Sequence, residues 1–216
     1  MKIRALIFDF DGLIVDTETP MMEAYAEIHA QHGVAFDRAA FMRSVGHADF
    51  VFDPWHGFSP HADRAALEIE RRALNRTLVT HQPVLPGIIA LLDGARAHDL
   101  RVGLASNSEH SWVEPHLERL GLLSRFEFLA CSGDAPSPKP EPDLYRLVLN
   151  RFGLRGQEAI AFEDSHTGSL AAKRANLWVV AAPNPSTAHH DFDHTDLRVA
   201  SLAEIDLPAL LTRFET

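Results

Sequence analysis

Short apolar runs of three to six residues alternate along this chain with segments of helical periodicity. Runs of this length are typical of buried strands, and their alternation with helices favours a parallel sheet covered by helices. The predicted strands are Ile3–Phe8, Val102–Ala105, Phe126–Ala130, Ala159–Phe162, Trp178–Ala181 and Arg198–Ala200. The predicted helices between them are Ile88–His98, Glu109–Leu120, Pro142–Phe152 and Thr167–Ala175. The expected fold class is therefore α/β, with a doubly wound, mainly parallel sheet.

The first two predicted strands are separated by far more residues than one crossover helix needs. The intervening residues show helical periodicity and no convincing strand. The helix signals expected there are starts at Thr19-Pro20 and Asp37, an end at Gly33, and a longer helix over 62–79. We therefore predict an α/β core of residues 1–16 plus 83–216 and a helical insert of residues 17–82.

One segment of the helical insert, residues 53–61, has no periodicity and carries Trp55 and Phe58. Two interpretations stay open for these rings. They either fill the small hydrophobic core of the insert or face a ligand from a specificity loop.

Composition suits one globular unit and excludes several functions. The chain has 216 residues, of which 46% are hydrophobic, and its net charge of -10 argues against a broad nucleic-acid-binding surface. No apolar run approaches the roughly 20 residues that cross a bilayer, and the N-terminus shows no leader pattern. The single Cys131 is expected to be a small buried side chain. We expect a cytoplasmic protein, monomeric or weakly homo-oligomeric, with no membrane partner.

Carboxylates are concentrated directly after the first predicted strand. Asp9, Asp11, Asp16 and Glu18 lie within ten positions, and Gly12 follows the second of them. Like charges this close repel one another unless a cation or a shared proton offsets them, and the glycine indicates a sharp turn. The pattern predicts a metal-assisted catalytic loop, with Asp16 serving the architecture of the loop.

The chain holds a second copy of the same tripeptide for comparison. Asp191-Phe192-Asp193 has no apolar run before it and no glycine after it, and histidines surround it. We interpret it as a solvated loop, with adventitious metal binding by the histidines as the alternative. The strand before Asp9, rather than the tripeptide itself, is what favours a functional site there.

Four segments resemble, in order, the motifs of the haloacid dehalogenase superfamily in its phosphatase and phosphomutase branch. They are Phe8-Asp9-Phe10-Asp11-Gly12-Leu13-Ile14-Val15-Asp16-Thr17, Leu104-Ala105-Ser106-Asn107-Ser108, Ser137-Pro138-Lys139-Pro140-Glu141-Pro142-Asp143, and Phe162-Glu163-Asp164-Ser165 followed by Gly168. These segments follow predicted strands, and the carboxyl ends of strands in a doubly wound sheet meet at a ligand-binding crevice. The resemblance implies a Rossmann-like core, a helical cap that closes over the crevice, and Mg²⁺-dependent chemistry on phosphate esters.

The residue types fit phosphoryl transfer, which needs an in-line nucleophile, charge neutralisation and a proton for the leaving oxygen. The carboxylate of Asp9 can attack phosphorus and form an aspartyl-phosphate. Asp11 can protonate the leaving alcohol and later take a proton from water. Ser106 either holds a phosphate oxygen, together with the N–H groups that follow it at Asn107, or caps the next helix.

Lys139 is notable because this chain has 17 Arg but only 3 Lys. A lysine between two prolines suggests that a compact ammonium is required, and the alternative is an exposed surface lysine. The resemblance has Lys139 bridge Asp9 and the transferred phosphoryl group. For the ion, it assigns the Asp9 side chain, the Asp11 backbone carbonyl and Asp164. Glu163 would bind the ion directly or through water, and oxygen-only ligands suit Mg²⁺.

The expected function is hydrolysis of a small phosphorylated metabolite, such as a sugar phosphate. The main alternative is a sugar phosphomutase similar to beta-phosphoglucomutase. Those enzymes carry a His where this chain has Met21, and an Arg soon after a Gly that resembles Gly46, where this chain continues with His47-Ala48-Asp49. Arg43 could take the place of that Arg. A third reading is a non-catalytic phospho-acceptor or binding protein similar to receiver domains, which are shorter and carry no helical cap.

Overall fold

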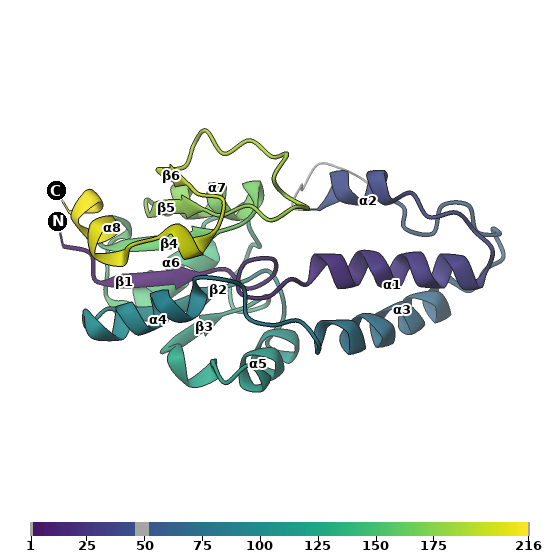
Figure 1. Cartoon of the computed structure of the whole chain (residues 1–216), viewed down its shortest axis with the longest axis horizontal. Helices are drawn as coiled ribbons and strands as arrows, with labels where there is room; N and C mark the ends of the chain where they lie inside the picture. The colour runs from purple at the N-terminus through teal and green to yellow at the C-terminus, as the bar shows by residue number, and fades with distance from the viewer. Residues whose placement is uncertain (1, 46–51, 216) are drawn as a thin grey trace.

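The computed structural model describes residues 2–45 and 52–215. Within them, six strands form one parallel sheet in the order β3-β2-β1-β4-β5-β6 (Figure 1). The strands are β1 (Ala5–Phe8), β2 (Arg101–Ala105), β3 (Phe128–Ala130), β4 (Ala159–Glu163), β5 (Trp178–Ala181) and β6 (Leu197–Arg198). The helices are α1 (Glu18–Gln31), α2 (Arg38–Ser44), α3 (Arg64–Val79), α4 (Ile88–Ala97), α5 (His110–Arg119), α6 (Asp143–Phe152), α7 (His166–Arg174) and α8 (Leu207–Phe214). The predicted α/β, doubly wound parallel class is confirmed.

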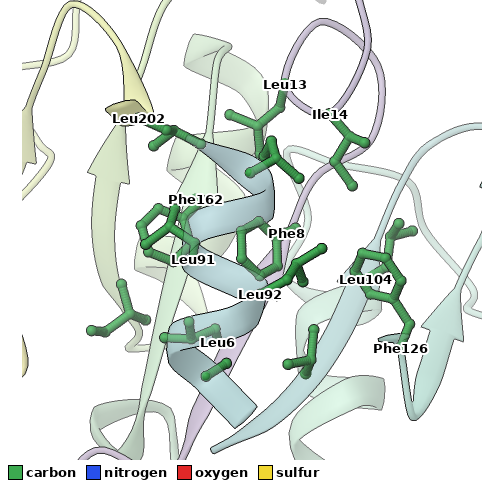
Figure 2. Close-up of a cluster of buried hydrophobic side chains, with 14 of the residues drawn as sticks. Leu6, Phe8, Leu13, Ile14, Leu91, Leu92, Leu104, Phe126, Phe162 and Leu202 are labelled. Carbon is green, nitrogen blue, oxygen red and sulfur yellow. The ribbon is translucent and has the colours of Figure 1, made fainter. Parts of the chain in front are cut away.

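Helices cover both faces of the sheet. Leu6 and Phe8 of β1 belong to a cluster that includes side chains of α4, α5 and α8, as Figure 2 shows for Leu91 and Leu92 of α4. The alternate residues of β1, Ala5 and Ile7, pack in a second cluster with α6 and α7. Because neighbouring strand residues point to opposite faces and both faces are buried, the strands appear in the sequence as unbroken apolar runs.

The helical insert lies beyond the carboxyl ends of the strands, whereas both chain termini lie at the opposite end of the molecule (Figure 1). The side chains of Asp37 and Asp63 accept backbone N–H groups at the starts of α2 and α3, as capping predicts. The insert has a hydrophobic cluster of its own, which consists of Tyr25, Ile28, Phe41, Val45, Trp55 and Leu67. It therefore folds around a small separate core.

The rings of the 53–61 segment serve that small core. Trp55 is buried, its ring centroid lies 5.4 Å from that of Tyr25, and Phe58 packs against the same cluster. Of the two interpretations that the sequence left open, the structure shows the packing one. The residues after Gly46 that bear on the mutase alternative, together with Gly46 itself, lie outside the described residues.

Element boundaries differ from the predictions by a few residues. Pro142 precedes the first turn of α6 instead of opening it, and β6 is two residues long. The helix α8 was not predicted, although Asp206 caps it through the N–H of Ala209. Cys131 is buried as predicted, and burial raises the pKa of its thiol to about 12. No helix among the described residues has the length and apolar character needed to cross a membrane.

Candidate active site

The site lies where the central strands of the sheet end. Phe8, the last residue of β1, is in register with Leu104 of β2 and Phe162 of β4. The next residue of the chain, Asp9, donates its backbone N–H to Phe162 at 3.0 Å. Parallel register therefore places Asp9 between the end of β2, which leads to Ser106, and the end of β4, which carries Glu163.

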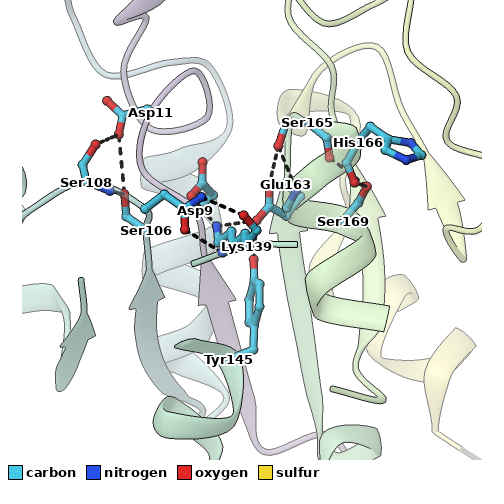
Figure 3. A network of polar contacts seen from close by, with 12 residues as sticks. Asp9, Asp11, Ser106, Ser108, Lys139, Tyr145, Glu163, Ser165, His166 and Ser169 are labelled. Carbon is cyan, nitrogen blue, oxygen red and sulfur yellow. Dashed lines mark hydrogen bonds and ion pairs between the residues drawn. The ribbon is translucent and has the colours of Figure 1, made fainter. Parts of the chain in front are cut away.

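Lys139 joins two of these strand ends (Figure 3). Its buried Nζ atom donates to Asp9 Oδ1 and to Glu163 Oε1, each at 2.6 Å. The hydroxyl of Tyr145 donates to the same Glu163 oxygen, and the ring of Tyr145 lies 5.1 Å from Nζ. The surface-lysine alternative for Lys139 is therefore wrong, because the ammonium is buried and paired with two carboxylates. The two charges raise the pKa of Lys139 against the opposing effect of burial.

Three buried carboxylates, those of Asp9, Glu163 and Asp164, offer oxygen atoms that all lie within 4.8 Å of one another. In the described part of the chain, the only ammonium that pairs with this group is that of Lys139, which contacts Asp9 and Glu163 but not Asp164. Burial raises the pKa of Asp9 to about 8 despite Lys139, and burial with neighbouring carboxylates raises that of Asp164. A further positive charge would keep the group ionised, so this oxygen-only cluster fits a divalent cation.

Asp11 lies apart from this cluster and is held by hydrogen bonds from the loop after β2 and from α5. Ser108 Oγ donates to Asp11 Oδ2 at 2.6 Å, and Trp112 Nε1 donates to Oδ1 at 2.9 Å. Ser106 Oγ is 3.5 Å from Oδ2 (Figure 3). The Asp11 carboxylate is therefore not part of the three-carboxylate group. Its backbone carbonyl, which the resemblance assigns to the ion, stays a prediction.

Ser108 and Trp112 were not predicted from the sequence as partners of Asp11. The signal available was their position: both follow β2 closely, at the edge of the sheet where the site was expected. Ser and Trp can each donate a hydrogen bond to a carboxylate, which makes them candidates for orienting an acidic group.

Ser106 and Asn107 directly follow β2, and their side chains form hydrogen bonds with loop residues at the ends of the strands. Helix α5 is preceded by Glu109, so the helix-cap interpretation of Ser106 is wrong. Ser106 Oγ instead accepts the backbone N–H of Ser108 at 3.0 Å. The side chain of Asn107 spans the backbone of Lys139, accepting its N–H at 2.8 Å and donating to its carbonyl at 3.2 Å. Asn107 therefore positions Lys139, while contact of Ser106 and Asn107 with phosphate stays a prediction.

Asn184, which was also missed, ties the loop after β1 to the end of β4. Its Nδ2 atom lies 2.7 Å from Glu18 Oε2, 2.9 Å from Asp164 Oδ2 and 3.2 Å from the Gly12 carbonyl. Burial raises the pKa of Glu18 to about 7, although the bond from Asn184 opposes this rise. Asn184 follows β5 between two prolines, a strand-end position that could have indicated it.

Two glycines permit the close packing of this region. A Cβ on Gly12, whose φ is +74°, would lie 2.5 Å from Asp164 Oδ2. A Cβ on Gly168 would lie 2.1 Å from Glu163 Oε2. Side chains at either position would displace a carboxylate of the cluster, so both glycines are required by close approach.

The other predicted features of the loops have simple structural roles. Asp16 Oδ1 accepts the N–H groups of Glu18 and Thr19 at the start of α1, as its predicted loop role requires. In the second tripeptide, Asp191 and Asp193 are exposed whereas Phe192 is buried. The two Asp-Phe-Asp tripeptides thus differ in burial as well as in context.

Two adjoining pockets meet at Asp11. A pocket of about 280 Å³ is lined by residues that include Asp9, Ser106, Lys139 and Asp164. A larger one of about 490 Å³ lies between the helical insert and α5. Asp11 and Glu18 line both pockets. A molecule bound in the smaller pocket can therefore extend past the Asp11 carboxylate into the larger one.

The fold and the site define a class: doubly wound α/β proteins with a carboxylate after the first strand, a buried lysine and an acidic pair after a later strand. A family model described as haloacid dehalogenase-like hydrolase matches residues 3–176, and the chain belongs to this family. YhcW of Bacillus subtilis is 38% identical over 97% of this chain and 96% of its own. Hexitol phosphatase B of Escherichia coli K12 is 30% identical over 97% of each chain.

A solved structure extends the comparison to a bound sugar. A mutant of CbbY from Rhodobacter sphaeroides, in complex with xylulose-(1,5)bisphosphate, superposes on this chain with a TM-score of 0.76. The two are 25% identical, and the match covers 96% of this chain and 99% of CbbY. The similarity therefore includes the helical insert as well as the core.

Proposed function

We propose that this protein is a Mg²⁺-dependent phosphomonoesterase that hydrolyses small phosphorylated metabolites, sugar phosphates in particular, through an aspartyl-phosphate. One observation carries the proposal. The Asp9 carboxylate is held by Lys139 beside two further buried carboxylates, in a pocket that Asp11 also lines. Two similar proteins, hexitol phosphatase B and the sugar-bound CbbY, support the substrate class. The cytoplasmic location and the oligomeric state stay predictions from the sequence.

In the proposed first step, one Asp9 oxygen attacks phosphorus as the bond from phosphorus to the leaving oxygen breaks. Lys139, bonded to Asp9 at 2.6 Å, orients this carboxylate and offsets negative charge on the phosphoryl oxygens. The Ser106 hydroxyl and the N–H of Asn107 hold another phosphoryl oxygen, while the N–H of Ser108 donates to the Ser106 hydroxyl. Asp11 gives its proton to the leaving alkoxide, which departs as an alcohol into the larger pocket.

In the second step, water attacks the phosphorus of the aspartyl-phosphate, and Asp11 takes the proton of that water. The phosphorus–Asp9 bond breaks, which restores the Asp9 carboxylate and releases inorganic phosphate. A divalent ion bound by Asp9, Glu163 and Asp164 would supply positive charge that draws the phosphoryl group toward the nucleophile. We propose that the helical insert acts as a cap that excludes bulk water during both steps.

The mutase alternative is less supported. Met21, at the position where the mutases carry a His, lines the larger pocket with a thioether that cannot transfer a proton. Arg43 lies on α2 and is not among the described residues that line that pocket. Neither Met21 nor Arg43 therefore offers a group that would bind a second phosphate in this pocket.

A phosphate-release assay tests the proposed function. Sugar and polyol monophosphates incubated with the protein and Mg²⁺ are expected to yield free phosphate. With beta-glucose 1-phosphate, free phosphate should exceed glucose 6-phosphate. Efficient isomerisation without phosphate release would instead establish the mutase, and no reaction on any ester would contradict both.

Mg²⁺ is expected to raise the melting temperature of the protein, because it would offset repulsion among three buried carboxylates. The increase should shrink as the pH falls from about 8 toward about 5, since protons compete with the ion for carboxylates whose pKa burial has raised. Thermal unfolding with and without Mg²⁺ measures this. Asp164→Asn should remove most of the increase, whereas Asp193→Asn, an exposed control, should preserve it.

A further inference from the structure

The larger of the two pockets is where a leaving group would lie if phosphate occupies the smaller one. On the side of the helical insert, its wall includes Met21 of α1 and four side chains of α3, which are Arg71, Arg72, Asn75 and Arg76. Trp112 of α5 lines the opposite side and donates to Asp11. The polar side chains of α3 are therefore among the groups that can distinguish one leaving group from another.

The buried stripe of α3 is polar in the middle. Its four buried residues are Leu67, Arg71, Asn75 and Val79, which are spaced by four and so lie along one face. At the apolar ends of the stripe, Leu67 packs in the hydrophobic cluster of the insert and Val79 is fully buried. The two polar residues between them are the ones that line the pocket.

Arg71 has its partners, but Asn75 does not. Arg71 donates to both oxygens of Glu68, at 2.6 and 3.2 Å, and its guanidinium lies over the ring of Tyr25. Asn75 is only 8% exposed, and its amide oxygen has no hydrogen-bond partner among the described residues. A buried amide oxygen without a partner costs free energy that an apolar side chain would avoid. The oxygen itself is enclosed, so a ligand in the pocket would remove this cost by bonding to the amide once rotation about the Cβ–Cγ bond turns the oxygen toward the pocket.

The chemistry of the pocket favours an uncharged ligand with hydroxyl groups. A hydroxyl both donates and accepts, so it satisfies the Asn75 amide in either of its two orientations, whereas an anionic oxygen only accepts. The guanidinium groups of Arg71 and Arg72 are already paired with Glu68, whereas Arg76 has no ion pair among the described residues. The carboxyl groups of Asp11, Glu18 and Glu109 line the same pocket and outnumber that one guanidinium, which disfavours a second phosphate.

We propose that the larger pocket receives the uncharged, polyhydroxylated alcohol part of a sugar or polyol monophosphate, and that Asn75 determines specificity by hydrogen bonding to one of its hydroxyls. This inference rests on the proposed phosphatase function. It adds to that function a substrate class, uncharged polyol leaving groups, and a residue that selects it.

The test compares two substrates with the same six-carbon chain, sorbitol 6-phosphate and hexyl phosphate. The wild-type protein should prefer sorbitol 6-phosphate in kcat/KM. Asn75→Leu should lower that preference about tenfold, since one hydrogen bond is lost. Asn75→Ala, whose smaller side chain cannot block the pocket, should lower it similarly. Asn150→Leu changes an exposed asparagine of α6 and should leave the preference unchanged.

Thermal unfolding separates recognition from a structural role. Asn75→Leu should melt at the wild-type temperature or above it, because an unpartnered buried amide is removed. If it melts lower and both substrates lose kcat/KM equally, the role assigned to Asn75 is wrong. A wild-type preference for glucose 1,6-bisphosphate over glucose 6-phosphate would overturn the uncharged leaving group. Equal turnover of sorbitol 6-phosphate and hexyl phosphate would overturn this inference alone, whereas no turnover of any ester would contradict the phosphatase itself.

Discussion

Replacing Asp9 with asparagine is expected to lower kcat for phosphate-ester hydrolysis by at least about 10⁴-fold. Asparagine matches aspartate in shape, but its neutral amide is a poor nucleophile, so no aspartyl-phosphate forms. Phosphate release from saturating sorbitol 6-phosphate in the presence of Mg²⁺ measures the effect. Asp193→Asn makes the same chemical change at an exposed position of the second tripeptide and should retain wild-type kcat.

The Asp9→Asn protein should also carry a stability signature that does not depend on activity. In the metal-free protein, burial raises the pKa of Asp9 from 3.8 to about 8. Between those values the folded state binds a proton that the unfolded chain has released, so stability falls as the pH rises from about 4 to about 8. Asparagine does not titrate, so the unfolding free energy of the variant should fall less steeply over this range. Unchanged pH dependence together with wild-type kcat would contradict the role given to Asp9.

The strands could be predicted from sequence because burial on both faces turns each of them into an unbroken apolar run. The boundaries of β1, β2, β4 and β5 accordingly differ from the predictions by two residues or fewer. The helix α8 was missed for a different reason. Its buried residues Leu207, Leu210, Leu211 and Phe214 follow the helical spacing, and Asp206 gives a start signal, but the pattern is short and ends the chain.

The candidate site likewise contains some residues that the local sequence predicts and others that depend on how distant segments pack. Asp9, Glu163 and Asp164 could be expected together because they follow predicted parallel strands, whose carboxyl ends meet at one edge of the sheet. The structure adds that β1 and β4 are direct neighbours. The partners of Asp11 could not be expected, since Trp112 is separated from it by 101 positions and approaches only once α5 has packed. Asn184 likewise reaches Asp164 and Glu18 from a loop whose path the sequence does not specify.

The effect of Asp11→Asn should depend on the leaving group. For a sugar or polyol phosphate the alkoxide is strongly basic and needs a proton, so kcat should fall by about 10²–10⁴-fold. Bond cleavage in p-nitrophenyl phosphate should be far less affected, because nitrophenolate leaves without protonation. Trp112→Phe keeps an aromatic ring but loses the N–H that donates to Asp11 at 2.9 Å. It should therefore show the same dependence on leaving group with a smaller decrease.

In the proposed mechanism, Asp11 also acts in the second step, the hydrolysis of the aspartyl-phosphate. The Asp11→Asn variant should therefore give a further result that is specific to this mechanism. With p-nitrophenyl phosphate, Asp11→Asn should form the aspartyl-phosphate quickly but hydrolyse it slowly, since water no longer loses its proton to a carboxylate. Rapid mixing should then show a burst of nitrophenolate close to one per protein molecule, followed by slow turnover. Sorbitol 6-phosphate should give no burst, because its first step is itself slowed. Equal losses on both substrates without a burst would indicate that Asp11 only shapes the pocket, and the acid and base would have to be sought among its neighbours, starting with Glu18, which lines both pockets.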